Sequence, residues 1–240
     1  MTERDFFVGA DVPRVPRETL ERLRAYGACV AGDAMRGFNA MDGRIRALAS
    51  EACVCGCAVT VRLRPGDNLM LHKAIEIAQP GDILVLDTGG SYRHAVIGGM
   101  MSAAAFGKGI GGLVIDGAVR DIEDLRQNGY PVFAAAVVPS AGDSEGPGQL
   151  NRPISCGGVP VLPGDIIVAD GNGVTVVPRD CLELVLERCE ARGQVEKKRM
   201  AEIRQGQVTA AGILAKLELK DEEKESARQD MQKMLDYVDK

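Results

Sequence analysis

Five short apolar runs, each bounded by glycine, proline or aspartate, constrain this chain more than any other feature of its sequence. The runs occupy residues 57–63, 82–87, 112–117, 132–138 and 165–170. Each is short and continuous in apolar, often β-branched residues, which predicts a strand that is buried on both faces. A sheet made of such strands needs a covering layer on each side.

The segments between these runs alternate with them as helices. Residues 67–82 predict a helix that opens on Asp67 as its N-cap, and residues 98–109 predict a helix that ends at Gly107. Apolar residues at helical spacing also predict one or two helices within residues 16–35.

Residues 168–178 differ from the preceding segments because they predict a hairpin that turns at residues 170–173. If residues 16–35 form two helices, Gly27 is the expected break between them. Helices that alternate with strands early, followed by hairpins later, predict a layered α/β domain and not a purely doubly wound sheet.

The character of the chain changes after residue 178, so we expect an α/β core over residues 1–178 and a helical C-terminal extension over residues 179–240. Residues 179–206 form one charged, amphipathic helical pattern. A second helical stretch then places five apolar residues on one stripe: Ala227, Met231, Met234, Leu235 and Val238. This tail needs a partner surface, which its own core or a neighbouring subunit would supply.

Charge and composition exclude several classes of partner. The formal net charge is −5, tryptophan is absent and aromatic residues make up 4% of the chain, so we expect no nucleic-acid partner. No apolar run reaches the roughly 18 residues that span a bilayer, and the first residues lack the apolar core of a signal peptide. We therefore expect a cytoplasmic protein without a membrane partner, whose seven cysteines are reduced.

Two motifs that resemble known sites favour structural interpretations. The glycines of residues 107–112 close a helix and precede a strand, the reverse of the order in a dinucleotide-binding loop. Cys53, Cys55 and Cys57 lie two residues apart, a spacing that suits small buried side chains better than a metal site.

The two histidines give little indication of a site, because neither has a second histidine or a cysteine at ligand spacing. His72 is expected on a helix surface. His94 lies near the glycine-rich start of the next helix and is a candidate to line a pocket, without other support.

Arg120 and Asp121 are the strongest candidate functional residues, because they follow a buried strand and the Gly117 turn, where α/β proteins bind ligands. A structural interpretation competes: Asp121 would cap the following helix, with Asp124 completing something like a capping box. The helix that starts at residues 98–101 favours the functional interpretation, because its N–H groups suit a carboxylate or phosphate. An arginine, such a helix start and a carboxylate suited to a hard cation together predict a site for a metal-chelating oxyacid.

Five motifs, taken in order, resemble the RraA-like family, which includes the 4-hydroxy-4-methyl-2-oxoglutarate and 4-carboxy-4-hydroxy-2-oxoadipate aldolases and the regulator of ribonuclease activity A. The resemblance runs from about residue 34 to residue 178 and weakens in the tail. Its motifs are GCAVTVRLRPGDN, PGDILVLDTGG, GIGGLVIDGAVRD, YPVFAAAVVPSAG and CGGVPVLPGDIIVADGNGVTVVP.

The resemblance implies a layered β/β/α swivelling-type core, assembled as a homotrimer or a homohexamer with active sites between subunits. It implies that Arg120 holds a keto acid as the catalytic arginine, that Asp121 binds Mg²⁺ or Mn²⁺, and that the backbone amides of Met100 and Met101 receive the substrate carboxylate. Residues 195–199, VEKKR, loosely resemble a segment that supplies a glutamate in trans, which makes Glu196 a candidate. A solvated charge on an amphipathic helix is the alternative for Glu196.

Gly99 departs from the aldolase pattern, which has an acidic residue twenty intervening positions before the arginine. The substrate-binding set Gly99, Met100, Met101 and Arg120 and the metal residue Asp121 are otherwise in place. The sequence therefore does not identify the general base, and water or a residue of another subunit would act as that base.

The function that these residues and the resemblance predict is a divalent-metal-dependent carbon–carbon lyase. Its substrate would be a small oxyacid that contains a pyruvate unit, split by retro-aldol cleavage or decarboxylated as oxaloacetate is. The alternative is a non-catalytic regulator that binds a partner enzyme such as a ribonuclease.

Overall fold

The computed structural model describes residues 6–206, 225 and 229. By its contacts the chain divides into two units, Met1–Gly193 and Gln194–Lys240. Every strand of the described residues belongs to the first unit. That unit carries the candidate site.

Four neighbouring parallel strands form the middle of a ten-stranded sheet: β3 (Val54–Leu63), β4 (Ile83–Asp87), β6 (Gly112–Val119) and β7 (Val132–Val137). These four strands confirm four of the five predicted apolar runs. β3 begins three residues earlier than predicted because its first part pairs with another strand. Shorter strands extend the sheet or flank it: β1 (Phe6–Val8), β2 (Arg46–Ala47), β5 (Ala95–Ile97) and β8 (Gly148–Leu150).

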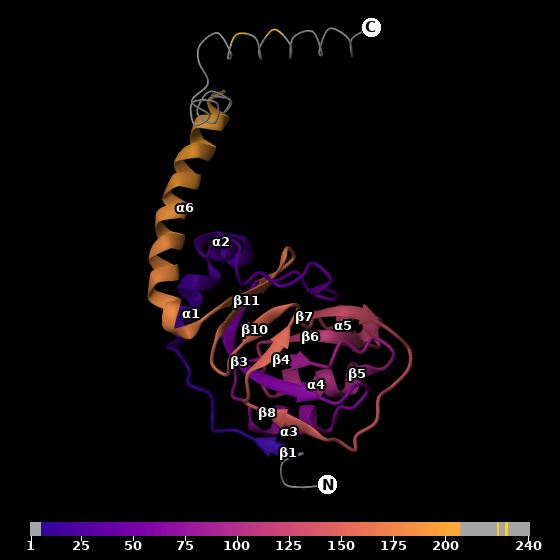
Figure 1. Cartoon of the computed structure of the whole chain (residues 1–240). Coiled ribbons are helices and arrows are strands. Elements are labelled where there is room, and N and C mark those ends of the chain that lie inside the picture. Colours follow the sequence, from indigo (N-terminus) through magenta and orange to yellow (C-terminus); the bar gives the residue numbers. More distant parts are fainter. Residues whose placement is uncertain (1–5, 207–224, 226–228, 230–240) are drawn as a thin grey trace, which may run out of the picture. The chain divides into compact units, whose positions relative to one another are not determined.

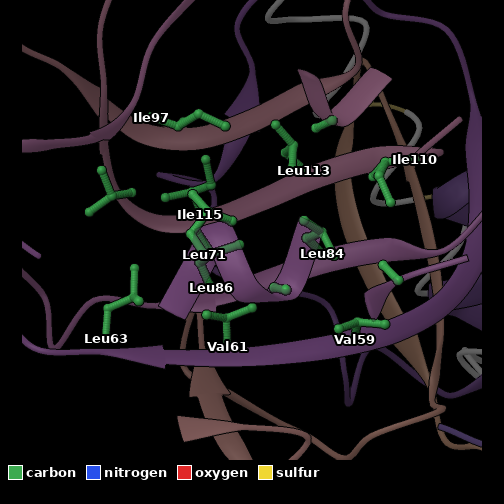
Figure 2. Packing of buried hydrophobic residues seen from close by; sticks show 14 of the residues in the cluster. Val59, Val61, Leu63, Leu71, Leu84, Leu86, Ile97, Ile110, Leu113 and Ile115 are labelled. Atoms are coloured by element: carbon green, nitrogen blue, oxygen red, sulfur yellow. The ribbon is translucent and has the colours of Figure 1, made fainter. Parts of the chain in front are cut away.

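Helices cover one face of this sheet. They are α3 (Leu69–Ile77), α4 (Gly99–Gly107) and α5 (Ile122–Gln127). Figure 2 shows the result. Alternate residues of β3, β4 and β6, such as Val61, Leu86 and Ile115, lie in one buried cluster with Leu71 of α3. Because β3, β4 and β6 side chains alternate between faces, their other residues must be covered by a second layer.

The second layer is made of strands. It consists of β9 (Ile154–Cys156), β10 (Val159–Val161), β11 (Ile166–Asp170) and β12 (Gly173–Val177). Ile83, Val85 and Val114 on the opposite face of the main sheet pack against Ile167 and Val176 of this layer. β3 joins both layers, because its residues 54–57 pair with β11 and its residues 58–62 pair with β4.

Three helices cover the outer side of β11 and β12: α1 (Arg17–Arg24), α2 (Gly27–Ala34) and the first turns of α6 (Leu182–Arg204) (Figure 1). Ile166 and Val168 of β11 lie in one buried cluster with Val185 and Leu186 of α6. The core thus has a helical layer, two β layers and a further helical layer. The predicted layered α/β class, with a helix after residue 178, is confirmed.

Several local predictions are confirmed and one is wrong. Residues 16–35 form two helices that meet at Gly27, whose φ of +74° few other residues adopt. The hairpin from β11 to β12 turns between Asp170 and Gly173. Asp67, however, is not the N-cap of α3: Asn68 takes that position, and Asp67 accepts the N–H of Leu69 from one residue further back.

The region after residue 178 begins with a short 3₁₀ turn, η1 (Arg179–Cys181), and continues as α6. The first unit extends past the boundary predicted at residue 178, because Leu182, Val185 and Cys189 of α6 are buried against α1 and α2. The apolar stripe predicted from Ala227 to Val238 lies outside the described residues.

No helix in the described part of the chain combines the length and the apolar character that crossing a membrane requires.

Candidate active site

The site forms where two adjacent parallel strands end. β5 and β6 pair in parallel, with Ile97 opposite Val119, so their carboxyl ends lie at the same edge of the sheet. Gly98 and α4 follow β5, and Arg120, Asp121 and α5 follow β6. The N–H of Arg120 donates to the carbonyl of Ile97 at 3.0 Å, which fixes the two strand ends together. Open α/β sheets bind ligands at such edges.

Asp121 has a backbone conformation that residues other than glycine rarely adopt. Its φ is +56° and its ψ is +45°, in the left-handed region. Aspartate tolerates this region better than most residues, but the conformation still costs about 1–3 kcal/mol and persists where surrounding structure enforces it. The left-handed turn places Asp121 at the start of α5 while Arg120 still lies at the end of β6.

The Asp121 carboxylate does not cap its own helix. The structure shows no hydrogen bond from α5 to this side chain; instead Asp121 Oδ2 accepts the N–H of Gly99, the first residue of α4, at 2.9 Å. The competing interpretation, a capping box with Asp124, is therefore wrong. Because α4 has no acidic residue in its own first turn, Asp121 supplies the negative charge that the helix dipole favours there.

Arg120 lies beside that carboxylate. Its Nε is 3.6 Å from Asp121 Oδ2, and 36% of its side chain is exposed, so its guanidinium keeps N–H groups for a ligand. A Cβ atom at Gly98 would collide with Asp121 Oδ2 and would lie 3.0 Å from Arg120 Nε. Gly98 is thus required for α4 to approach the arginine and the aspartate this closely.

These groups converge on one cavity of about 390 Å³. Arg120 and Asp121 line it, together with Met100 and Met101 from the first turn of α4. The N–H groups of a helix's first turn have no acceptor inside the helix, so those of Met100 and Met101 are suited to bind an anion. The remaining lining residues are Asn68, His72, Ile75, Ala95, Ile97, Gly98, Ala104, Ala141 and Gly142.

Gly99 is the first residue of α4, and its part in substrate binding stays a prediction. It is not among the residues that line the cavity, and its N–H is occupied by Asp121. A Cβ atom at Gly99 would lie 2.7 Å from Oδ2 of Asp124. The place where an acidic side chain at position 99 would begin is therefore next to the carboxylate of Asp124, which is exposed on α5.

The carboxylates of Asp121 and Asp124 thus flank the first turn of α4. Mg²⁺ and Mn²⁺ prefer oxygen ligands, and Mg²⁺ is typically held by one or two carboxylates, substrate oxygens and water. The described residues contain no cluster of three or more histidine, cysteine, aspartate or glutamate side chains of the kind that encloses a metal. The donor set fits a hard cation that shares its coordination with a ligand, and it does not fit a closed structural metal site.

A buried aspartate fixes the loop on the other side of the cavity. Asp67 Oδ2 accepts the N–H groups of Glu145 at 2.8 Å and Gly146 at 2.7 Å, while Oδ1 accepts that of Leu69 at 2.9 Å. Burial by itself would raise the pKa of Asp67, but these N–H donors and Arg64 outweigh it and hold the pKa below its ordinary value. The segment that brings Ala141 and Gly142 to the cavity is thereby tied to the start of α3.

The remaining candidates are not among the residues that line this cavity. Glu196 is exposed on α6, in the second unit, and its role in trans stays a prediction. Cys55 and Cys57 are free thiols, and burial raises the pKa of both, as expected for unreactive packing residues. His94 lines a neighbouring hollow with Gly66 and Asp143.

Sequence reasoning missed His72 and Asn68, which line the cavity from α3 and from the residue before it. Their spacing of four residues was the available signal, since it places them on one helix face. What the sequence lacked was the position of that face relative to Arg120.

Comparison with known proteins agrees with this architecture. The family model described as RraA-like, Aldolase/RraA, matches residues 28–176. A Halalkalibacterium halodurans protein provisionally named 4-hydroxy-4-methyl-2-oxoglutarate aldolase is 36% identical over 82% of this chain and 94% of its own length. The Thermus thermophilus protein named 4-hydroxy-4-methyl-2-oxoglutarate aldolase is 39% identical over 47% of this chain and 68% of its own length.

A solved structure of the RNA-processing inhibitor RraA from Thermus thermophilus superimposes with a TM-score of 0.57 at 34% identity. The match covers 61% of this chain and 89% of that one. Relatives of this chain thus carry the names of aldolases and of an inhibitor. With the family model matching more than half of its residues, the chain belongs to the RraA-like family.

Proposed function

We propose that this protein is a divalent-metal-dependent lyase that breaks a carbon–carbon bond next to a pyruvate unit. The observation that supports this most is the convergence of Arg120, Asp121 and the first turn of α4 on one cavity. Each group has a different task for a 2-oxo acid, and the aldolase names of relatives agree with the assignment.

The chain's own groups would bind the two oxygen-bearing ends of a pyruvate unit. The N–H groups of Met100 and Met101 would receive its carboxylate, since a helix N-terminus favours negative charge. Arg120 would donate to the keto oxygen or the carboxylate through its planar guanidinium, which suits such oxygens better than a lysine does.

Asp121, which lines the cavity, would hold Mg²⁺ or Mn²⁺. When bound, such an ion acts as a Lewis acid toward the keto oxygen and helps to stabilise the negative charge that develops there. Arg120 adds to that stabilisation from a position 3.6 Å from the Asp121 carboxylate.

Two reactions use the same stabilisation. In retro-aldol cleavage the C4 hydroxyl loses its proton, the C3–C4 bond breaks, and its electron pair forms the enolate of pyruvate, which is then protonated at C3. In decarboxylation of oxaloacetate the electron pair of the C3–C4 bond takes the same path and CO₂ leaves. Only the first reaction needs a base for a hydroxyl proton, which water or a residue of another subunit would supply.

Asp124 changes the expectation for Gly99. The sequence suggested that the site lacks an acidic group at position 99. In the structure, the Asp124 carboxylate lies where the side chain of residue 99 would begin, so an acidic group is present next to Gly99. We therefore expect both reactions, and we expect Gly99→Asp to weaken metal-dependent activity by placing two carboxylates in contact.

The test is release of pyruvate by the full-length protein from 4-hydroxy-4-methyl-2-oxoglutarate and from oxaloacetate, each with added Mg²⁺ or Mn²⁺. Metal without protein is the control for spontaneous decarboxylation. We expect turnover that a chelator abolishes and that excess metal restores. Absence of turnover with both substrates would leave the regulator, a binding protein for a partner enzyme, as the better function.

A further inference from the structure

Met100 is the most exposed methionine among the residues that the structure describes. It is 87% exposed, although its side chain is apolar, and it lines the cavity from the first turn of α4. Met200 on α6 is 51% exposed, Met101 is half-buried against the core, and Met70 is only 4% exposed. Met100 therefore combines access for a small solute with a position in the candidate site.

The thioether of an exposed methionine is open to oxidation by hydrogen peroxide. The sulfur attacks one peroxide oxygen, an S–O bond forms as the O–O bond breaks, the sulfur is oxidised to a sulfoxide and the peroxide is reduced to water. This change converts a flexible apolar side chain into a polar one, and methionine sulfoxide reductases reverse it. Hydrogen peroxide is smaller than any 2-oxo acid, so a cavity that admits such an acid also admits the oxidant.

A sulfoxide oxygen on Met100 would be a hydrogen-bond acceptor beside the donors that an anionic ligand needs. Arg120 lines the same cavity, and 36% of its side chain is exposed, so its guanidinium keeps N–H groups to donate. The first-turn N–H groups of α4 have no acceptor within the helix. Because methionine has three rotatable bonds, its oxidised terminal group can turn toward these donors and compete with the ligand for them.

The cysteines are less suited to such a role. None of the seven, each of which lies in the described part of the chain, lines the cavity. Burial raises the pKa of Cys55 and of Cys57, which keeps these thiols protonated and unreactive. Cys29 and Cys181 are exposed, so an experiment with peroxide must separate their oxidation from that of methionine.

We propose that Met100 is a reversible oxidation site that controls ligand binding, such that the thioether form of the protein binds its oxyacid and the sulfoxide form binds it weakly. This inference rests on the proposed function in one respect, because Arg120 and the first turn of α4 bind the anionic ligand there. The Met100 side chain takes no part in breaking the carbon–carbon bond.

The experiment treats the full-length protein with hydrogen peroxide in the presence of a chelator and measures the sulfoxide at each methionine by peptide mass spectrometry. Dithiothreitol then reduces cysteine disulfides and sulfenic acids and leaves the sulfoxides in place. Affinity for oxalate is measured by calorimetry with Mg²⁺ before oxidation, after it, and after repair by methionine sulfoxide reductases. Wild type is compared with Met100→Leu and with Met200→Leu, the matched control that removes another exposed thioether.

We expect Met100 and Met200 to oxidise faster than Met101, and Met70 to oxidise last. Oxidation should lower the oxalate affinity of wild type and of Met200→Leu by about tenfold or more, the effect of losing hydrogen bonds to a charged ligand, and repair should restore it. Met100→Leu, compared with its own untreated sample, should lose no affinity.

Three results would overturn the inference: oxidation of Met100 as slow as that of Met70, unchanged oxalate affinity of wild type once Met100 is oxidised, or an equal loss of affinity in Met100→Leu. Untreated wild type that fails to bind oxalate would instead overturn the proposed function. The oxidation rates alone would then decide whether Met100 is the modified residue.

Discussion

At the scale of single residues, Asp121 has two roles that can be separated. It accepts the N–H of Gly99 across the site. In the proposed function, its carboxylate also binds the cation. Asparagine is suited to separate these roles, because it tolerates the left-handed conformation and its amide oxygen still accepts an N–H. The asparagine side chain has no negative charge, so the substitution removes the carboxylate ligand that a hard cation prefers.

Asp121→Asn should therefore abolish metal-dependent turnover while it changes the free energy of unfolding by less than about 1 kcal/mol. The measurements are pyruvate release with saturating Mg²⁺ and urea unfolding without metal. Asp121→Ala is the matched comparison, because it also loses the hydrogen bond to Gly99 and should be the less stable of the two variants. Wild-type turnover by Asp121→Asn would show that this residue is only a helix cap.

Arg120 is expected to act through the shape of its guanidinium as well as through its charge. Arg120→Lys keeps the charge but presents a single ammonium in place of a planar pair of donors. Affinity for oxalate, a mimic of the pyruvate enolate, should fall at least tenfold, measured by calorimetry with Mg²⁺. Arg126→Lys is a suitable control, since Arg126 bonds the Leu48 carbonyl and does not line the cavity. Unchanged oxalate affinity in Arg120→Lys would remove Arg120 from the ligand site.

At the scale of elements, the approach of α4 to the end of β6 depends on Gly98. Gly98→Ala places a methyl group against Asp121 Oδ2 and Arg120 Nε, so both side chains must move. We expect turnover to fall at least tenfold with a small change in thermal stability, because both displaced side chains are partly exposed. The measurement is kcat/KM for pyruvate release beside the midpoint of thermal unfolding.

Gly107→Ala is the control within the same helix. Nothing lies within 4 Å of a Cβ atom at Gly107, and the substitution should leave turnover unchanged and stabilise α4 by about 0.5–1 kcal/mol. If Gly98→Ala is as active as Gly107→Ala, close approach of α4 to Arg120 is not needed for the reaction.

The connection between α3 and the loop at Glu145 and Gly146 predicts a dependence of stability on pH. Because the folded protein holds the pKa of Asp67 below its ordinary value of 3.8, the charged form stabilises the fold above that pH. That contribution is lost as pH falls through the lowered pKa. Both carboxylate oxygens accept N–H groups, so Asp67→Asn must turn one NH₂ toward a donor.

Asp67→Asn should lower the free energy of unfolding at pH 7 by about 1.5–3 kcal/mol and flatten its dependence on pH below about 4. Urea unfolding at several pH values measures both effects. Asp143→Asn removes an exposed carboxylate that also pairs with Arg64 and should change stability by at most about 0.5 kcal/mol. Equal effects of the two substitutions would contradict the assigned role of Asp67.

The elements were predictable where burial leaves a strong pattern. The runs that became β4, β6 and β7 are apolar on both faces, because the main sheet is covered on both sides. The short strands β1, β2, β5, β8, β9 and β10 were not predicted. Strands of two or three residues carry too little pattern, and pairing with distant segments, such as β1 with β8, creates them.

At the scale of the whole molecule, the layered class and the position of Arg120 and Asp121 followed from sequence, while their partners did not. The apolar run before Arg120 identifies the edge of a sheet, although β6 continues past Gly117, where a turn was predicted. The run does not show that Asp121 bonds to α4, or that Asp124 lies beside Gly99. Those contacts join segments that are 20 or more residues apart, and only the packing of α4 against α5 brings them together.

The layered fold explains why the site can be rigid although the residues that line it come from separate segments. β5 and β6 anchor α4 and α5 at one edge of the sheet, and the Asp67 hydrogen bonds anchor the facing loop. Assembly into a homotrimer or a homohexamer, with Glu196 reaching a neighbouring site, stays a prediction.

The central claim is that this cavity stabilises the enolate of pyruvate, and the exchange of pyruvate's methyl hydrogens with solvent deuterium tests it most directly. The measurement follows loss of the methyl signal by proton NMR, with the full-length protein and Mg²⁺ in D₂O. It needs no second substrate and does not depend on which bond the enzyme breaks. The account predicts exchange that a chelator stops and that Asp121→Asn lacks. A wild-type protein that binds oxalate yet exchanges pyruvate no faster than Mg²⁺ alone would contradict it.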